Sequence, residues 1–566
     1  MAKWTTHRIS ELVRDIGDEV YVLPVVQRKL VWSTDKMELL FDTLLKKDIF
    51  GGIMVIDEER GNEPLFAYRP FSMNGEATQS SQVGSLLKLT FFVIDGQQRL
   101  QSYYMGLKGS FNGMRLYFDL FSSPTSYEFK FARNESDLHR VADVDEDSER
   151  EIKQRKWYPV PELFSRLIHF QDYGPVCKEI GKGHTGTLID AQRAAIDDNV
   201  RTFFRNVFEL ERVGVAHVVN TSDDRKANTS RIVELFRRLN DGGTRLSAYD
   251  LFASKMKGFN WKMEAFLDRL VAPNSAYAKI GLTQDTLIKL VFLLQGDAQK
   301  DIQDVTEADA DFAVNNSDRI ERALRNTVDF LDKSKLANYF GSGNRTFIPI
   351  LFIGHHLFYR QAPADYFRNY DTGNPDAKPL RDWVFHSMLN GTFKGRGTGW
   401  IAHKTGVRMI LELMETAKGK DFPIGKLLGL YRTKLHVFTT DYVTADLSEL
   451  DHDFVLFMLS DRERAIGPQD LDHIHPRSRL EARGVESYKI NSLANYELLD
   501  FATNRGPKNG ALFDQWLNNP AKVPDKDEYM KRQLIPHDPD LHKIERFDDF
   551  LAERTRMIRE KLQAAF

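Results

Sequence analysis

Cysteine is almost absent from this chain. Among 566 residues the only cysteine is Cys177, which excludes disulfide bonds within the chain and any zinc site built on cysteine. Long hydrophobic runs are missing as well, because no apolar stretch reaches the roughly 18 residues that a membrane-spanning helix needs. The first residues, Met1 to Arg8, lack the apolar segment of a signal peptide. These absences predict a cytoplasmic protein without a membrane partner.

Net charge is also small, with 78 Lys and Arg against 81 Asp and Glu, a formal charge of −3. A chain of this charge does not attract nucleic acid over its whole surface, so any DNA-binding surface must be local. The hydrophobic content of 42% is ordinary for a globular protein with a core. A length of 566 residues allows roughly three domains.

The spacing of hydrophobic residues divides the chain into three parts. The first mixes strands with helices: residues 86–94 have the composition of a strand and residues 36–47 the spacing of an amphipathic helix. Helical spacing dominates the middle, and the last part combines a short strand, loops and a closing helix. The sequence therefore predicts a multidomain α+β protein with domains at 1–265, 266–440 and 441–566.

A candidate catalytic motif lies in the last part, where Asp472-His473-Ile474-His475-Pro476 precedes Asn491, Asn495 and Asn504-Arg505-Gly506. An Asp-His pair on a short strand, followed by asparagines, is typical of an HNH nuclease. Such a site needs an imidazole that deprotonates water and oxygen ligands for a divalent cation. A surface loop with two polar histidines is the alternative. Because alternate residues of a strand share a face, His473 and His475 both remain candidates for the base.

A second polar cluster follows two predicted strands in the first part. The strand that ends at Ile94 leads into Asp95, Gly96, Gln97, Gln98 and Arg99, where a helix begins. A glycine turn at a helix start exposes N–H groups to a phosphate, while the arginine adds a cation and the aspartate can carry a metal ion. Gln27 and Arg28 follow the other strand. The alternative is a plain helix cap beside a surface arginine.

Together these segments resemble the GmrSD-type family of prokaryotic defence nucleases, whose relatives include BrxU and SspE. The resemblance rests on Gln27-Arg28 with Trp32, on Asp95 to Arg99, on residues 236–247 and on the C-terminal segments quoted above. It implies a ParB-like α/β domain at the N-terminus and a ββα-metal (HNH) domain at the C-terminus, with a helical region of unmatched sequence between them. The C-terminal segments are also similar to the HNH domain of RNA-guided CRISPR nucleases.

The resemblance implies an NTP-regulated, metal-dependent DNA endonuclease of type IV restriction or a related defence system. It would restrict modified phage or foreign DNA by nicking or by double-strand cutting. The nucleotide (GTP, ATP, CTP or UTP) would bind the Asp95–Arg99 turn together with Gln27 and Arg28. Two alternatives stay open: a ParB-like nucleotide switch that binds DNA or a partner and has weak HNH activity, and an RNase-type toxin. The oligomeric state, including a homo-oligomer, also stays open.

The resemblance also assigns roles in the nuclease site. His473 is the general base, Asp472 and Asn504 ligate Mg²⁺ or Mn²⁺, and Asn495 orients His473 by hydrogen bonding. His475 is kept as a second ligand or as the base itself. The separation of Asp472 and Asn504 is longer than in compact HNH sites, which an insertion around residues 480–488 explains. Flanking phosphates are assigned to Arg477, Arg505 and Lys508.

Overall fold

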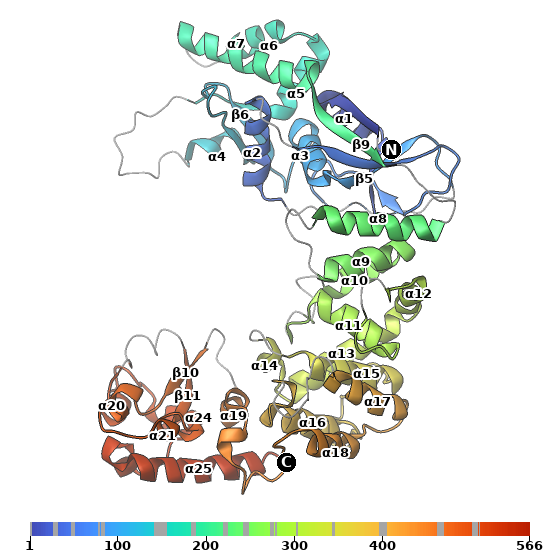
Figure 1. The fold of residues 1–566 in the computed structure, drawn as a ribbon. Helices are drawn as coiled ribbons and strands as arrows, with labels where there is room; N and C mark the ends of the chain where they lie inside the picture. The colour runs from blue at the N-terminus through green and yellow to red at the C-terminus, as the bar shows by residue number, and fades with distance from the viewer. Residues whose placement is uncertain are drawn as a thin grey trace. The chain divides into compact units, whose positions relative to one another are not determined.

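The structure is a computed structural model in which the chain forms two compact units, Met1–Glu264 and Ala265–Phe566 (Figure 1). No helix in the described residues combines the length and the apolar composition that a membrane crossing needs. The structure describes residues 3–26, 32–46, 51–76, 78, 80, 85–140, 155–182, 188–218, 225–240, 248–271, 277, 280–300, 304–341, 346–394, 405–460, 469–500, 508 and 510–566.

A mixed β-sheet forms the centre of the N-terminal unit. Its parallel pairs are β2 with β5 and β3 with β9, and its antiparallel pairs are β1 with β9, β3 with β5 and β2 with β4. Within the described residues the strand order is β1 (Lys3–Arg8), β9 (Glu211–Val218), β3 (Ile53–Glu58), β5 (Thr90–Asp95), β2 (Tyr21–Pro24) and β4 (Tyr68–Arg69).

Both faces of this sheet are covered, because alternate residues of its central strands enter different cores. In β5, Val93 packs into the core beneath α1 (Ile9–Gly17), α2 (Thr34–Leu45) and α3 (Gln97–Lys108). Its neighbours Phe92 and Ile94 pack with Ile232 of α8 (Arg225–Asn240). Figure 1 shows α8 along one side of the sheet and α1 and α3 on the other. Burial on both faces explains why residues 91–94 are all apolar rather than alternating. The predicted strand 86–94 began too early, because β5 begins at Thr90 and Leu87 and Leu89 are exposed.

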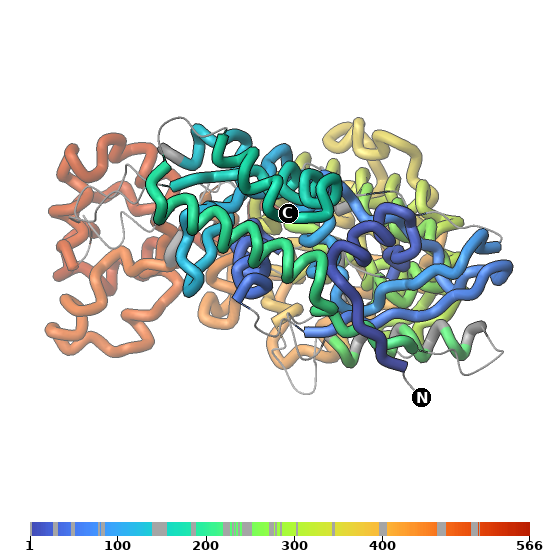
Figure 2. Tube along the Cα trace, turned by 90° about the horizontal axis from the view of Figure 1, so that it is seen from above, coloured from blue at the N-terminus to red at the C-terminus, as the bar shows by residue number. Residues whose placement is uncertain are grey.

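The remaining elements of this unit surround the sheet. A small antiparallel sheet has the order β7 (Phe129–Ala132), β6 (Arg115–Asp119) and β8 (Trp157–Pro159) in the described residues. Helices α6 and α7 pack side by side, drawn in cyan to green in Figure 2. The other helices are α4 (Glu135–Arg140), α5 (Val160–Phe170), α6 (Tyr173–Lys182), α7 (Asp190–Phe204), the π-helical turn Arg205–Glu209 and α9 (Ala248–Phe259).

The C-terminal unit begins with helices, as the spacing of its hydrophobic residues predicts. Helix α10 (Met263–Val271) spans the division between the units. Helix α15 has eleven buried residues, and it packs against α11, α13 and α17. The helices are α11 (Gln284–Leu294), α12 (Glu307–Asn315), α13 (Ser317–Lys333), α14 (Ala337–Gly341), α15 (Ile348–Tyr359), α16 (Ala377–Leu389), α17 (Val407–Thr416), α18 (Ile424–Lys434) and α19 (His452–Leu459).

The last part of the chain builds an antiparallel hairpin of β10 (Gln469–His473) and β11 (Tyr496–Asp500). An isolated two-stranded sheet is only marginally stable, so this hairpin depends on the helices around it. Helix α19 contacts β11, and α25 contacts both α19 and the turn Leu493–Asn495. These helices are α20 (Arg477–Glu481), α21 (Ser487–Ile490), α23 (Phe513–Leu517), α24 (Lys526–Gln533) and α25 (Phe547–Gln563).

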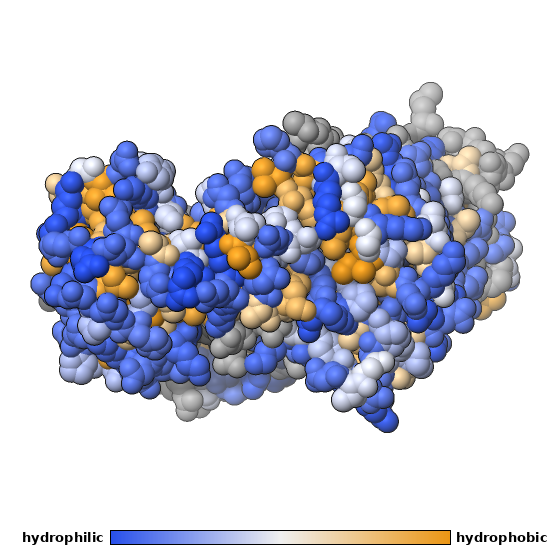
Figure 3. Space-filling model, turned by 90° about the horizontal axis from the view of Figure 1, so that it is seen from below, coloured by the Kyte–Doolittle hydropathy of each residue, from blue (hydrophilic) through white to orange (hydrophobic). Residues whose placement is uncertain are grey.

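The mixed α+β class predicted from the sequence is confirmed. Seen from below, hydrophobic side chains gather in separate groups that hydrophilic side chains border (Figure 3). Exposed apolar side chains of the C-terminal unit include Leu471 and Tyr488, at 46% and 70% exposure. Single side chains of this kind are ordinary on protein surfaces.

Candidate functional site

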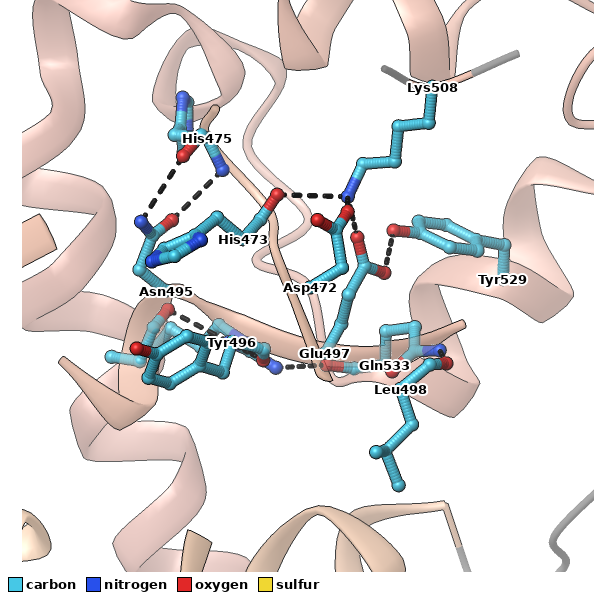
Figure 4. Close-up of polar contacts among 12 residues, drawn as sticks. Asp472, His473, His475, Asn495, Tyr496, Glu497, Leu498, Lys508, Tyr529 and Gln533 are labelled. Atoms are coloured by element: carbon cyan, nitrogen blue, oxygen red, sulfur yellow. Dashed lines mark hydrogen bonds and ion pairs between the residues drawn. The ribbon is translucent and has the colours of Figure 1, made fainter. Parts of the chain in front are cut away.

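The register of the β10–β11 hairpin pairs two residues of the predicted nuclease site, Asp472 and His473, with polar residues of β11. Asp472 lies opposite Glu497, and His473 lies opposite Tyr496. Because neighbouring residues of a strand point to opposite faces, the two pairs lie on different faces of the hairpin. The carboxylates therefore meet on one face, and the imidazole meets an aromatic ring on the other (Figure 4).

His473 has a defined hydrogen-bond partner, the side-chain amide of Asn491. The distance from His473 Nε2 to Asn491 Oδ1 is 3.1 Å. The same oxygen accepts the Tyr496 hydroxyl at 3.2 Å, and Asn491 Nδ2 donates to Ser487 Oγ at 3.1 Å. An amide oxygen only accepts, so Nε2 carries the ring hydrogen in this arrangement. Nδ1 is then the unprotonated nitrogen, the form that a general base needs.

The Asp472 carboxylate forms an ion pair with the Lys508 ammonium. Lys508 Nζ lies 2.6 Å from Asp472 Oδ2 and 3.0 Å from the main-chain oxygen of His473. The same ammonium pairs with Glu497, whose other oxygen accepts the Tyr529 hydroxyl (Figure 4). Burial, followed by the charge of Glu497, holds the pKa of Tyr529 well above its usual value, so this phenol stays a hydrogen-bond donor.

A cleft of about 300 Å³ opens beside the hairpin, and both Asp472 and His473 line it. Arg477 also lines the cleft; it is exposed and forms an ion pair with Glu481 at 2.7 Å. The structure therefore brings together a carboxylate, an imidazole and an exposed guanidinium. This arrangement leaves Arg477 as a candidate for a phosphate contact, as the sequence predicts.

His475 is not part of this cleft, which corrects its assignment as a second ligand or alternative base. The strand ends at His473, so the alternation that would place His475 beside it does not apply. The imidazole is 0% exposed and lies among the rings of Phe513, Phe547 and Phe550. Burial lowers the pKa of His475 to about 3, so the ring is neutral. A side chain enclosed in this way is a core residue.

Asn495 does not orient His473, contrary to the role predicted for it. Its Oδ1 accepts the main-chain N–H of His475 at 2.9 Å, and its Nδ2 donates to the oxygens of His475 and Ile490 at 3.2 and 2.9 Å. The side chain is 0% exposed. Asn495 therefore fixes the turn after β10, and Asn491 holds the imidazole instead.

Lys508 also lines the cleft, but its ammonium is held by carboxylates, which corrects its assignment to a flanking phosphate. Its side chain is 2% exposed and its ammonium is engaged by two carboxylates. The remaining predicted residues of this site, Asn504 and Arg505, lie outside the described residues.

Two residues of this site were not found from the sequence, Tyr496 and Glu497. The composition of residues 496–499 is typical of a strand, so this strand could have been predicted. No motif in the sequence shows how it pairs with the strand that contains Asp472. Knowing this pairing would have placed Glu497 opposite Asp472. Asn491 was quoted as part of the motif without a role.

The N-terminal cluster forms at the end of β5, where Asp95 is followed by the start of α3. Arg99 donates to the main-chain oxygen of Gly52 at 2.6 Å and pairs with Asp95 at 3.5 Å. The Asp95 side chain is 46% exposed and that of Arg99 21%. Both side chains therefore keep exposed surface at this edge of the sheet.

Gly96 explains how the turn fits between neighbouring strands. Its φ is +85°, a conformation that L side chains rarely adopt, and a Cβ atom there would lie 2.9 Å from Ile53 Cγ1. Gly51 has the same φ, and a Cβ there would lie 2.3 Å from Arg99 Nη1. Glycine at positions 51 and 96 thus allows Arg99 and the start of α3 to approach the first residue of β3, Ile53.

The strands that precede the two predicted phosphate clusters are neighbours in the sheet. Strands β2 and β5 are parallel, so their carboxyl ends lie together. Gln98 Oε1 accepts the main-chain N–H of Trp32, which follows β2, at 3.3 Å. Gln97 is buried in the first turn of α3. Gln27 and Arg28 lie outside the described residues.

These features describe a mixed α+β protein with one polar site in each unit. Residues 9–257 match the family described as GmrSD restriction endonuclease, N-terminal domain. This match confirms, over these residues, the resemblance to GmrSD-type nucleases seen in the sequence.

A curated relative is the uncharacterized protein MJ0686 of Methanocaldococcus jannaschii, which is 23% identical over 313 residues. The alignment covers 51% of this chain and 48% of the relative, so the chain spans about half the length of the curated protein it matches.

Proposed function

We propose that the chain is an NTP-regulated, divalent-metal-dependent DNA endonuclease that restricts modified phage or foreign DNA, with an HNH-type site in its C-terminal unit. The observation that carries this proposal is the cleft beside the β10–β11 hairpin, which Asp472 and His473 line together. The GmrSD domain at residues 9–257 supports the restriction class. A ParB-like N-terminal domain and a cytoplasmic location are parts of the same proposal.

The proton transfer in this mechanism belongs to His473. With Nε2 directed at Asn491, the imidazole accepts a proton on Nδ1 from the water that attacks the phosphate. Tyr496 packs against the ring, with 4.8 Å between centroids, and restricts its rotation. Arg477 holds a neighbouring phosphate of the strand at the rim of the cleft.

Asp472, together with Asn504, would hold Mg²⁺ or Mn²⁺, and the cation would neutralise charge on the phosphate. The donor chemistry fits, because carboxylate and amide oxygens suit hard divalent cations. Asp472 already accepts a cationic group, the Lys508 ammonium at 2.6 Å. In the described residues no three His, Cys, Asp or Glu side chains gather in a metal-binding arrangement.

The direct test incubates the purified chain with modified and unmodified phage DNA, with and without Mg²⁺ and each of GTP, ATP, CTP and UTP. We expect cleavage that disappears in excess EDTA, returns with Mg²⁺ or Mn²⁺, and depends on nucleotide. An RNA arm separates the nuclease from an RNase-type toxin. Full activity in EDTA would contradict the metal mechanism, and nucleotide-dependent DNA binding without cleavage would favour the ParB-like switch.

A separate prediction concerns the nucleotide. Asp95→Ala and Arg99→Ala should each weaken nucleotide binding about tenfold to hundredfold, because a charge-assisted phosphate or cation contact is worth on the order of 1.5–3 kcal/mol. Calorimetric titration measures the loss. Arg166→Ala is the matched control, since Arg166 lies in the same unit, is 43% exposed and forms a surface ion pair with Glu179. Unchanged affinity in both test variants would make Asp95–Arg99 a structural turn.

A further inference from the structure

Two carboxylates face each other across the β10–β11 hairpin with a buried cation between them. Asp472 and Glu497 are directly opposed, and like charges in that position destabilise a strand pair. We infer that Lys508 is a positioning residue for Asp472 and that Glu497 is the counter-ion that fixes Lys508. The inference rests on the proposed nuclease function, because it gives both residues a role at the cation ligand Asp472.

Lys508 is enclosed by its partners. Its side chain is 2% exposed and that of Glu497 is 0% exposed, whereas Asp472 retains 21% exposure toward the cleft. The ammonium also lies 5.4 Å from the centre of the Trp516 ring, a cation–π distance. Tyr529 donates to the second oxygen of Glu497, so both oxygens of this carboxylate are engaged.

The burial of Lys508 determines whether its ammonium competes with the metal ion for Asp472 or holds the Asp472 carboxylate in place. If the ammonium left, Glu497 would lose its ion-pair partner and keep only the charge interaction with the buried guanidinium of Arg554, which is unfavourable. Lys508 therefore stays on Glu497. It engages only Oδ2 of Asp472, and among the described residues Oδ1 forms no hydrogen bond. One carboxylate oxygen is thereby held in place while the other stays available at the cleft.

The Lys508 ammonium also contacts the main chain of His473, the proposed general base. It donates to the main-chain oxygen of His473 at 3.0 Å, so one cation contacts both Asp472 and the backbone of His473. Lys508 thus sets the position of the metal-binding carboxylate relative to the imidazole. Neither Lys508 nor Glu497 needs to touch DNA for this role.

A double variant separates positioning from structural support. Glu497→Gln with Lys508→Met removes one negative and one positive charge, so the local net charge is unchanged. Breaking a buried pair destabilises, whereas removing both partners is often neutral. We expect Lys508→Met to lower the unfolding temperature and the double variant to recover most of it. The double variant should still bind Mn²⁺ at least about tenfold more weakly than the unaltered chain and cleave DNA correspondingly more slowly.

Mn²⁺ titration by calorimetry and electron paramagnetic resonance gives a readout that does not depend on cleavage. The direction of the change in Mn²⁺ affinity in the single variant Lys508→Met is a further test. If Lys508 acted only through its charge, removing it would tighten Mn²⁺ binding. If Lys508 positions Asp472, removing it weakens Mn²⁺ binding. Tyr529→Phe is the control, because it removes a hydrogen bond to Glu497 without touching Lys508. It should lower stability and leave Mn²⁺ affinity unchanged.

The outcomes distinguish the inference from the function on which it rests. Mn²⁺ affinity and cleavage at the unaltered level in the double variant would overturn the inference and leave the nuclease intact. A double variant no more stable than Lys508→Met would overturn it too, because Glu497 would then not be the counter-ion. Failure of the unaltered chain to bind Mn²⁺ and cleave DNA would overturn both.

Discussion

Replacing His473 with alanine is expected to lower the rate of DNA cleavage by about 10²–10⁴-fold, the usual contribution of a general base. The fold should survive, because His473 is only half-buried and its ring has one hydrogen bond, to Asn491, and one aromatic contact, with Tyr496, among the described residues. Nucleotide binding should also survive, since Asp95 and Arg99 belong to the other unit. A single-turnover cleavage assay at saturating Mg²⁺, with circular dichroism of the same sample, measures both effects.

His475→Leu is the matched control for this experiment. It removes the second imidazole of the motif but replaces it with an apolar side chain among Phe513, Phe547 and Phe550. Neither ring nitrogen of His475 has a hydrogen-bond partner in the described part of the chain, so no polar group is left unpaired. Cleavage should stay at the unaltered level. Loss of cleavage in a folded His475→Leu variant, with normal activity in His473→Ala, would reverse the assignment of the base.

Replacing Arg554 with methionine is expected to destabilise the C-terminal unit by about 3–5 kcal/mol, as for other broken buried charge contacts. Arg554 is 0% exposed on α25. Its guanidinium donates to the main-chain oxygens of Ala494, Tyr496 and Gln533 at 2.8 Å, and to that of Leu534 at 3.2 Å. The variant removes all four hydrogen bonds, two of which are fully buried, and a buried acceptor that loses its donor costs free energy.

Chemical denaturation followed by fluorescence measures this change, and Arg556→Met provides the comparison. Arg556 lies on the same helix but is 56% exposed and pairs with Glu553 and Glu560 on the surface. Its replacement should leave the unfolding midpoint where it is. Equal midpoints for the two variants would show that the four carbonyl contacts of Arg554 do not support the unit.

Hydrophobic patterning was sufficient for the fold class and for most elements near the N-terminal site. The apolar run at 86–94 predicted β5, and the spacing in 36–47 predicted α2, because burial on one or two faces leaves a direct trace in the residue types. The turn after β5 was also predictable, since Gly96 in a left-handed conformation before a helix is a local requirement. The meeting of this turn with Trp32 depends on parallel pairing of β2 with β5, which the sequence does not encode locally.

The motif placed Asp472 and His473 in one site, but it did not assign their supporting residues. The prediction for His475 failed because β10 ends at His473 and the chain then turns into the core, a boundary that no residue type marks. Lys508 was assigned to phosphate because lysine is usually exposed. Its burial follows from Glu497, a carboxylate whose partner lies 11 positions further along the chain. Contacts set by tertiary packing of this kind are not visible in a single sequence.

The four carbonyl contacts of Arg554 also bear on the timing of folding. Both strands of the hairpin precede α25 in the chain, and Arg554 lies 60 residues after Ala494 and 58 after Tyr496. Contacts between such distant positions close late, because chain entropy must be lost before they form. During synthesis, the polypeptide would therefore emerge with its Asp-His strand unsupported until α25 has left the ribosome. Under the proposed function, a nascent chain would therefore not cut DNA before α25 has been synthesised.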